Sequence, residues 1–270
     1  MRYLSPVLVI GLVTSVPAQQ PKGEKSDVFA INKTLGRGMN FGNALEAPKE
    51  GDWGLKLEAE YFKHIRDAGF QSIRVPVKWS AHAAKDAPYA IDAEFFKRID
   101  WVLDQAEANK LNVVLNCHHY DEMNKEPDNH LPRLISLWEQ IAKRYKDRPA
   151  SVVFELLNEP QDKLVDDKWN SVIPPVMKTV RATNPTRPVI VGPPFWNGIW
   201  ALPKLKLPDD PFLILTVHYY DPYKFTHQGA PWGSEDVRKL TGLKWEGTEG
   251  ELKAMRDSFD RAEAWGKKNH

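Results

Sequence analysis

The chain has 270 residues, with 37 Lys and Arg against 36 Asp and Glu. This length fits one domain, since α/β barrels of about 250 residues are single domains. The balanced charge excludes the basic footprint of a nucleic-acid-binding protein and the polybasic patch of a membrane-surface protein. The single cysteine, Cys117, permits no intrachain disulfide.

The N-terminus has the pattern of a signal peptide. Arg2 supplies a positive start, and residues 6–16 form an apolar run that is shorter than the roughly 20 residues needed to span a bilayer. Small residues then lead to a cleavage site after Ala18. We therefore expect residues 1–18 to be removed on export, residues 19–35 to be a lead-in, and residues 36–270 to form the domain. A disordered apolar start is the alternative.

Short β-branched runs alternate with amphipathic stretches along the domain, which predicts an α/β fold with a parallel sheet. A closed barrel of this kind needs eight strand–helix units, whereas an open doubly wound sheet could stop at six. The number of units therefore leaves both folds open. The expected strands are 38–45, 70–77, 111–117, 150–157, 188–192 and 212–217, and the expected helices are 56–68, 93–109, 131–145, 167–183, a short piece over 196–202, and 248–268.

The tripeptide Asn158-Glu159-Pro160 places a carboxylate where an apolar strand ends. The carboxyl ends of the strands form the active face of a barrel. A turn with a solvated Glu is the usual fate of such a tripeptide, but polar groups also follow four other predicted strands. One convergent site explains them better than five separate core residues would. These groups are Asn43 and Glu46, Arg74, His118 and His119, and His218-Tyr219-Tyr220.

The combined motifs resemble glycoside hydrolase family 5, the cellulase and mannanase family of retaining (β/α)8 barrels. We therefore expect a (β/α)8 barrel of which this chain carries about six of eight units. The motifs that carry the resemblance are Gly38-Met39-Asn40-Phe41-Gly42-Asn43, Ile73-Arg74-Val75-Pro76, His118-His119, Leu157-Asn158-Glu159-Pro160 and His218-Tyr219-Tyr220.

The resemblance implies a role for each of these residues. Glu159 matches the general acid/base, and Asn158 the group that bonds the sugar 2-hydroxyl. Arg74 would orient the nucleophile, and His118 would join the polar network around the reacting sugar. His218 would support the acid/base and Tyr220 would touch the nucleophile. Sugar contacts would come from Asn43, Glu46, His119, His227 and Trp232, while Trp79 could either line the cleft or pack beneath it.

A retaining hydrolase needs a second carboxyl group about 5 Å from the first. Glu155 lies four residues before Glu159, about 13 Å along a strand, and we interpret it as a buried partner for Arg74. Asp221, Asp121 and Glu122 do not end an apolar strand. We therefore expect the nucleophile, a Glu on a seventh strand, beyond residue 270, and no activity from these 270 residues alone.

The expected substrate is a polysaccharide with internal β-1,4 linkages, of the cellulose type. A β-mannan substrate and a non-catalytic sugar-binding protein are the alternatives. The sequence indicates no cofactor and no metal site, because the eight His residues lack the clustered spacing of zinc ligands. It does not imply an oligomer.

Overall fold

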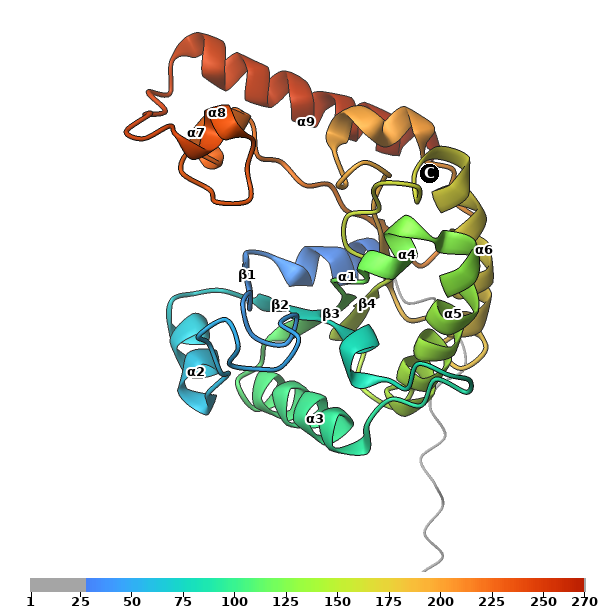
Figure 1. Cartoon of the computed structure of the whole chain (residues 1–270). Helices are drawn as coiled ribbons and strands as arrows, with labels where there is room; N and C mark the ends of the chain where they lie inside the picture. The colour runs from blue at the N-terminus through green and yellow to red at the C-terminus, as the bar shows by residue number, and fades with distance from the viewer. Residues whose placement is uncertain (1–27, 270) are drawn as a thin grey trace, which may run out of the picture.

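The structure is a computed structural model that describes residues 28–269; the predicted signal peptide lies outside these residues. Six parallel strands form one sheet in the order of the sequence (Figure 1). Each strand pairs only with its sequence neighbours, whereas the order of a doubly wound sheet reverses at a switch point. The strand order therefore favours the barrel. The strands are β1 (Gly38–Asn40), β2 (Ser72–Val77), β3 (Asn112–Cys117), β4 (Val152–Glu155), β5 (Val189–Val191) and β6 (Leu213–Leu215).

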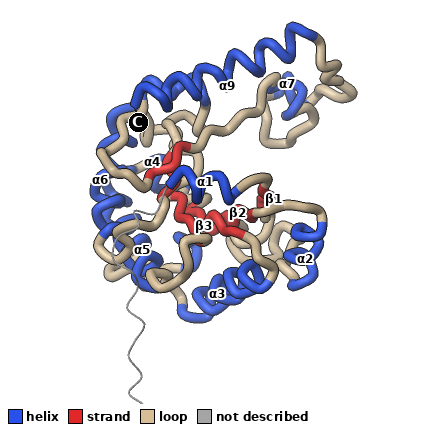
Figure 2. Tube along the Cα trace, turned by 180° about the vertical axis from the view of Figure 1, so that it is seen from behind, coloured by secondary structure: helices blue, strands red, loops and turns tan. Residues whose placement is uncertain are grey.

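Side chains alternate between the two faces of this sheet, as the strand geometry requires. The outer face packs against the helices that surround the strands in Figures 1 and 2. These helices include α2 (Ala59–Asp67), α3 (Ala93–Ala108), α5 (Pro127–Arg144) and α6 (Asp166–Arg181). The buried outward residues join one large apolar core and include Ile73, Val75, Val77, Val113, Leu115, Cys117, Val152, Phe154, Val189 and Val191.

The inner face carries a second, smaller apolar cluster of Val114, Val153, Ile190 and Ile214. The helix α1 (Val28–Leu35) covers it, and Val28, Ile31 and Leu35 pack against the cluster. Their spacing of three and four residues places them on one helical face. The sequence predicts only a lead-in over residues 19–35 and no helix there, because an eight-residue helix with three apolar contacts gives a weak periodic signal.

The predicted elements are present, but most strands are shorter than expected. The strand predicted over 38–45 ends at Asn40, and the turns after it contain Asn43 in the left-handed region, with φ 65°. Strand pairing stops where the turns at the carboxyl ends of the strands begin. The apolar pattern of the sequence does not mark that position. The other short elements are η1 (Trp79–His82), α4 (Asp121–Lys125), η2 (Ile199–Lys204), α7 (Tyr223–Thr226) and α8 (Glu235–Arg238).

The long helix α9 (Glu249–Asn269) packs along η2 and ends the described chain (Figure 1). The segment between β6 and α9, with α7 and α8, lies beside the N-terminal half of α9 in both views (Figures 1 and 2). Of the helices within residues 28–269, none combines the length and apolar content needed to cross a bilayer.

Candidate active site

Arg74 lies at the centre of a polar network on the inner face of the sheet. Its Nε and Nη2 donate to the two oxygens of Glu155, at 2.7 and 2.8 Å. Nη2 also donates to Asn158 Oδ1 at 2.8 Å, and Nη1 donates to Asn40 Oδ1 at 3.1 Å. Burial lowers the pKa of Arg74 and the Glu155 carboxylate raises it, with a raised pKa as the net result. The network therefore keeps a charged guanidinium beneath the carboxyl ends of the strands, with Glu155 as the partner that the sequence predicted.

Glu159 stands just beyond β4 with its backbone in the left-handed region, at φ 49°. A non-glycine residue adopts this conformation only where its surroundings impose it, and such residues are frequent at functional sites. Its Oε1 lies 2.6 Å from Nδ1 of His218, which follows β6. Strands β4 and β6 therefore bring together two residues that are 59 positions apart in the sequence.

His118 and His119 directly follow β3, and their ring centroids lie 4.7 Å apart. His118 Nδ1 lies 2.8 Å from Asn116 Oδ1. Burial, with Arg74, His119 and His218 nearby, lowers the pKa of His118 to about 2, and burial also lowers the pKa of His119. His118 is therefore neutral at any ordinary pH and donates from Nδ1 to Asn116.

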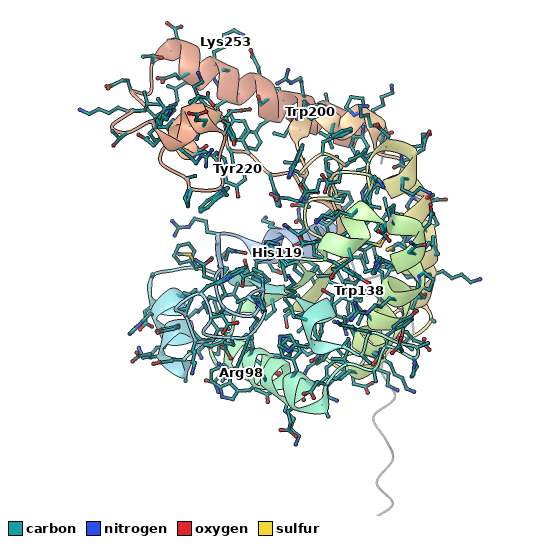
Figure 3. All side chains as sticks on the ribbon, viewed as in Figure 1. Arg98, His119, Trp138, Trp200, Tyr220 and Lys253 are labelled. Atoms are coloured by element: carbon teal, nitrogen blue, oxygen red, sulfur yellow. The ribbon has the colours of Figure 1, made fainter. Side chains whose placement is uncertain are left out.

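Two adjoining hollows meet at Glu159. Each is lined in part by Glu159, His218, Tyr219 and Tyr220. The first is polar and reaches down to the Arg74 network; Tyr220 and His119 line it from the C-terminal segment and from the strand layer, respectively (Figure 3). Its further lining includes Asn40, Arg74, His118, Glu155 and Asn158. The second is rich in aromatic rings and includes Phe195, Trp196, Trp200, Tyr223, His227 and Trp232.

Three of the predicted sugar contacts lie at the rims of these hollows. His119 lines the first, while His227 and Trp232 line the second. The His227 ring stacks on Tyr223 at 4.1 Å between centroids and meets Tyr220 at 5.0 Å. Trp232 is 80% exposed, so its indole face is available to a ligand.

The other two predicted contacts, Asn43 and Glu46, do not line either hollow. Glu46 is 4% exposed, and its carboxylate accepts from the backbone N–H groups of Asn43 and Ala44. Glu46 therefore holds the turn after β1, and Asn43 is exposed on that turn. Two backbone donors on one carboxylate are the arrangement of a capped turn.

The structure also settles Trp79 and adds aromatic residues that the motifs did not single out. Trp79 is fully buried and donates from Nε1 to the carbonyl of Asn116, so it packs beneath the site. Trp53 is 47% exposed and its ring meets His119 at 5.8 Å. Trp196 and Trp200 are more than half exposed on the wall of the second hollow. The sequence signal for these residues is the high number of Trp, ten among 270 residues.

Within residues 28–269, no group of three or more His, Cys, Asp or Glu side chains is arranged to hold a metal ion. The carboxylates that line the hollows are Glu155, Glu159 and Asp221. Glu155 is engaged by Arg74, and Asp221 lines only the second hollow. The side chains that line the two hollows are carboxylic acids, hydrogen-bond donors and aromatic rings.

Comparisons with known proteins agree with this geometry. Residues 33–270 match the family described as cellulase (glycosyl hydrolase family 5). Endoglucanase H of Acetivibrio thermocellus is 36% identical over 233 residues, which cover 86% of this chain and 26% of that protein. The chain therefore spans about a quarter of the length of that relative.

Solved structures of Thermotoga maritima Cel5A superpose closely. One in complex with cellobiose has a TM-score of 0.87 at 46% identity, covering 90% of this chain and 79% of that one. Another in complex with mannotriose has the same TM-score and coverage at 45% identity. The chain belongs to the cellulases of glycosyl hydrolase family 5.

Proposed function

We propose that the protein hydrolyses internal β-1,4 linkages of a glucan, with Glu159 as the general acid/base. The observation that carries this proposal is the position of Glu159 where the polar and the aromatic hollows meet. A glycosidic bond joins a reacting sugar to a leaving sugar, so its acid must stand between their two binding places. The polar hollow would hold the reacting sugar and the aromatic hollow the leaving sugars.

The polar hollow is suited to a pyranose ring that develops positive charge. Arg74 donates to the Oδ1 of Asn158. Among residues 28–269, no acceptor is paired with the Nδ2 of that amide, which would then donate to a sugar 2-hydroxyl. Such bonds strengthen in the transition state. Neutral His118 adds no positive charge beside the oxocarbenium-like centre, because its pKa is lowered to about 2.

The mechanism proposed is retaining, and its nucleophile would come from outside residues 28–269. Glu155 cannot serve while both of its oxygens accept from Arg74. Asp221 does not line the polar hollow, in which the reacting carbon would sit. Arg74 would orient the incoming carboxylate, and Tyr220, which lines both hollows, would lie close to it.

The choice of glucan rests on the relatives, which include named endoglucanases, and on the cellobiose complex of the Thermotoga maritima protein. The mannotriose complex of that protein supports β-mannan as a second substrate. Exposed Trp faces would accept either polymer, because both present apolar C–H surfaces.

The product of the complete reading frame should be assayed on soluble β-1,4-glucan, β-mannan and cello-oligosaccharides. A rapid fall in viscosity with few new reducing ends, and products that keep the β-anomeric configuration by NMR, would support endo action with retention. Release of single sugars from chain ends would contradict the endo assignment. Tight oligosaccharide binding without any hydrolysis would favour the non-catalytic sugar-binding alternative.

We also propose that the protein is exported, to the periplasm or outside the cell. The support is the apolar run over residues 6–16 and the small residues before Gln19. A polysaccharide substrate lies outside the cell, which agrees with export. Mass spectrometry of the protein purified from its native source should give an N-terminus at Gln19, whereas retention of residues 1–18 in a cytosolic fraction would contradict export.

A further inference from the structure

Asn197 lies on the far side of His218 from Glu159. Its Nδ2 is 3.3 Å from His218 Nε2, while His218 Nδ1 is 2.6 Å from Glu159 Oε1. We infer that the Asn197 amide sets the tautomer of His218 and thereby keeps the acid proton of Glu159 on Oε2. The inference rests on the proposed role of Glu159 as acid and makes Asn197 a positioning residue.

The hydrogen-bond capacities of the three groups lead to one arrangement. A neutral imidazole has one N–H and one lone pair. The Asn197 Nδ2 can only donate, so His218 Nε2 must present its lone pair, and the ring proton lies on Nδ1. Nδ1 then donates to Glu159 Oε1, which can accept this bond both when the carboxyl group is ionised and when it carries its proton on Oε2.

This arrangement decides where the catalytic proton can lie. If Glu159 carried its proton on Oε1, it would donate to Nδ1 and force the ring proton onto Nε2, against the N–H of Asn197. A doubly protonated ring would likewise place an N–H of Nε2 against the N–H of Asn197. Among the described residues, Oε2 of Glu159 has no protein hydrogen-bond partner, so the acid proton on Oε2 is directed to the substrate rather than to His218.

Contacts with the surrounding chain fix the position of Asn197 beside His218. It is fully buried, and its backbone carbonyl accepts from His218 N at 2.8 Å. The preceding Trp196 donates to the carbonyl of Pro160 at 3.2 Å, next to Glu159. Phe195, Trp196 and Asn197 all have left-handed backbones, with φ between 57° and 59°. Three successive non-glycine residues in this region are a strained turn that must be imposed by its contacts.

Gly192 packs directly against the side chain of Asn197. A Cβ added to Gly192 would stand 2.5 Å from the Cγ and Oδ1 of Asn197, so only glycine leaves room for the amide. Among residues 28–269, the buried Asn197 Oδ1 has no hydrogen-bond partner, and the side chain makes its hydrogen bond from Nδ2 to His218. An unpaired buried oxygen is costly.

Other charged and titratable groups face Glu159 and His218, and any test must leave them unchanged. Arg74 and His119 interact electrostatically with Glu159, and His118 with His218. Arg261 lines the aromatic hollow together with Glu159 and His218. None of these groups is changed by a substitution at Asn197.

The direct test is ¹⁵N NMR of the imidazole nitrogens in the full chain, which reports the tautomer without any need for activity. In the wild-type protein, His218 should carry its proton on Nδ1 and present an unprotonated Nε2. In Asn197→Asp, the new carboxylate accepts from Nε2–H, so Nε2 should become protonated. A wild-type Nε2–H tautomer, or an unchanged ring in Asn197→Asp, would overturn the inference.

Kinetics on the complete gene product give the functional readout. Asn197→Asp should lower kcat on glucan about tenfold, the size expected for one misplaced hydrogen bond, with little change in KM. It should also move the basic limb of the pH profile, while activity on an aryl glycoside with a good leaving group is largely kept. Equal losses on both substrates with an unmoved pH profile would contradict the positioning role.

The matched control is Asn124→Asp. Asn124 is also buried, and its Oδ1 accepts from Gln161 N, a bond that Asp preserves. It should leave the His218 tautomer and the pH profile unchanged, and a matching shift in this control would count against the inference. If the wild-type protein hydrolyses no glucan, the proposed function fails, while the NMR measurement still decides the His218 tautomer.

Discussion

Arg74 and Glu155 are 81 residues apart and form a two-pronged ion pair across the sheet. Arg74 lies on β2 and Glu155 on β4, so the pair spans β3 between them. The side chain of Glu155 is 3% exposed and that of Arg74 is 22% exposed. The ion pair beneath the site therefore belongs to the interior of the fold.

Replacing Glu155 with Gln should destabilise the protein markedly. Removing one partner of a buried pair typically costs about 3–5 kcal/mol, because the other charge remains buried. That corresponds to a fall in Tm of roughly 6–20 °C in a protein of this size. Asp128→Asn breaks the exposed pair with Lys168 and should leave Tm unchanged within error. Calorimetry would decide, and equal melting of the two variants would contradict the structural role of Glu155.

Glu159→Gln should reduce activity most on substrates whose leaving group needs a proton. General acid catalysis typically contributes about 10²–10⁴-fold, and an activated aryl glycoside needs little of it. Steady-state kinetics on glucan and on such an aryl glycoside would measure the difference. A similar loss on both substrates would rule out Glu159 as the acid.

Asn158→Ala should lower kcat more than it raises KM. Its amide is held by Arg74 at 2.8 Å and would bond the sugar mainly in the transition state. Arg74→Ala should act in the same direction but also reduce stability, so thermal melts must accompany its kinetics. An effect of Asn158→Ala confined to KM would show that the amide contributes only to ground-state binding.

His118 should make the folded protein less stable as the pH falls. Its pKa is lowered from 6.5 to about 2, so between these values the unfolded chain binds more protons than the folded one. Stability therefore rises with pH across this window and levels off above about 6.5. The loss between pH 6.5 and 5 should be roughly 1–2 kcal/mol.

Urea unfolding at several pH values would test this. His118→Asn should flatten the dependence between pH 5 and 6.5, whereas His64→Asn, on the exposed surface of α2, should show a dependence like that of the wild-type protein. A pH dependence that survives unchanged in His118→Asn would refute the assignment.

The parallel sheet and the convergence of its strand ends were predictable from the sequence. Buried strands on both sides of Glu159 read as apolar runs, and polar residues at their ends meet because parallel strands share one carboxyl edge. Glu155 as the partner of Arg74 was predictable too, since a charge on an apolar strand requires an opposite one. The strand order excludes the doubly wound sheet that the number of units left open.

Other parts of the site depend on tertiary contacts that no local pattern encodes. Asn197 carries no motif, and its contact with His218 arises from a bridge between Gly198 and His218 and a turn of left-handed residues. Trp79 and Trp53 are the same residue type, yet one is buried beneath the site and the other exposed beside His119. The engagement of Glu46 by two backbone N–H groups likewise appears only once the turn is built.

The segment over residues 221–245 has a consequence for how this site could diversify. It supplies His227 and Trp232 to the aromatic hollow, yet within it only Ala230 and Val237 are buried. Arg74, by contrast, lies on β2 in the interior pair with Glu155, and Glu159 stands just beyond β4. Mutations in the segment would therefore change ligand preference without disturbing Glu159 or the sheet, so that ligand preference and stability would evolve in separate parts of one chain.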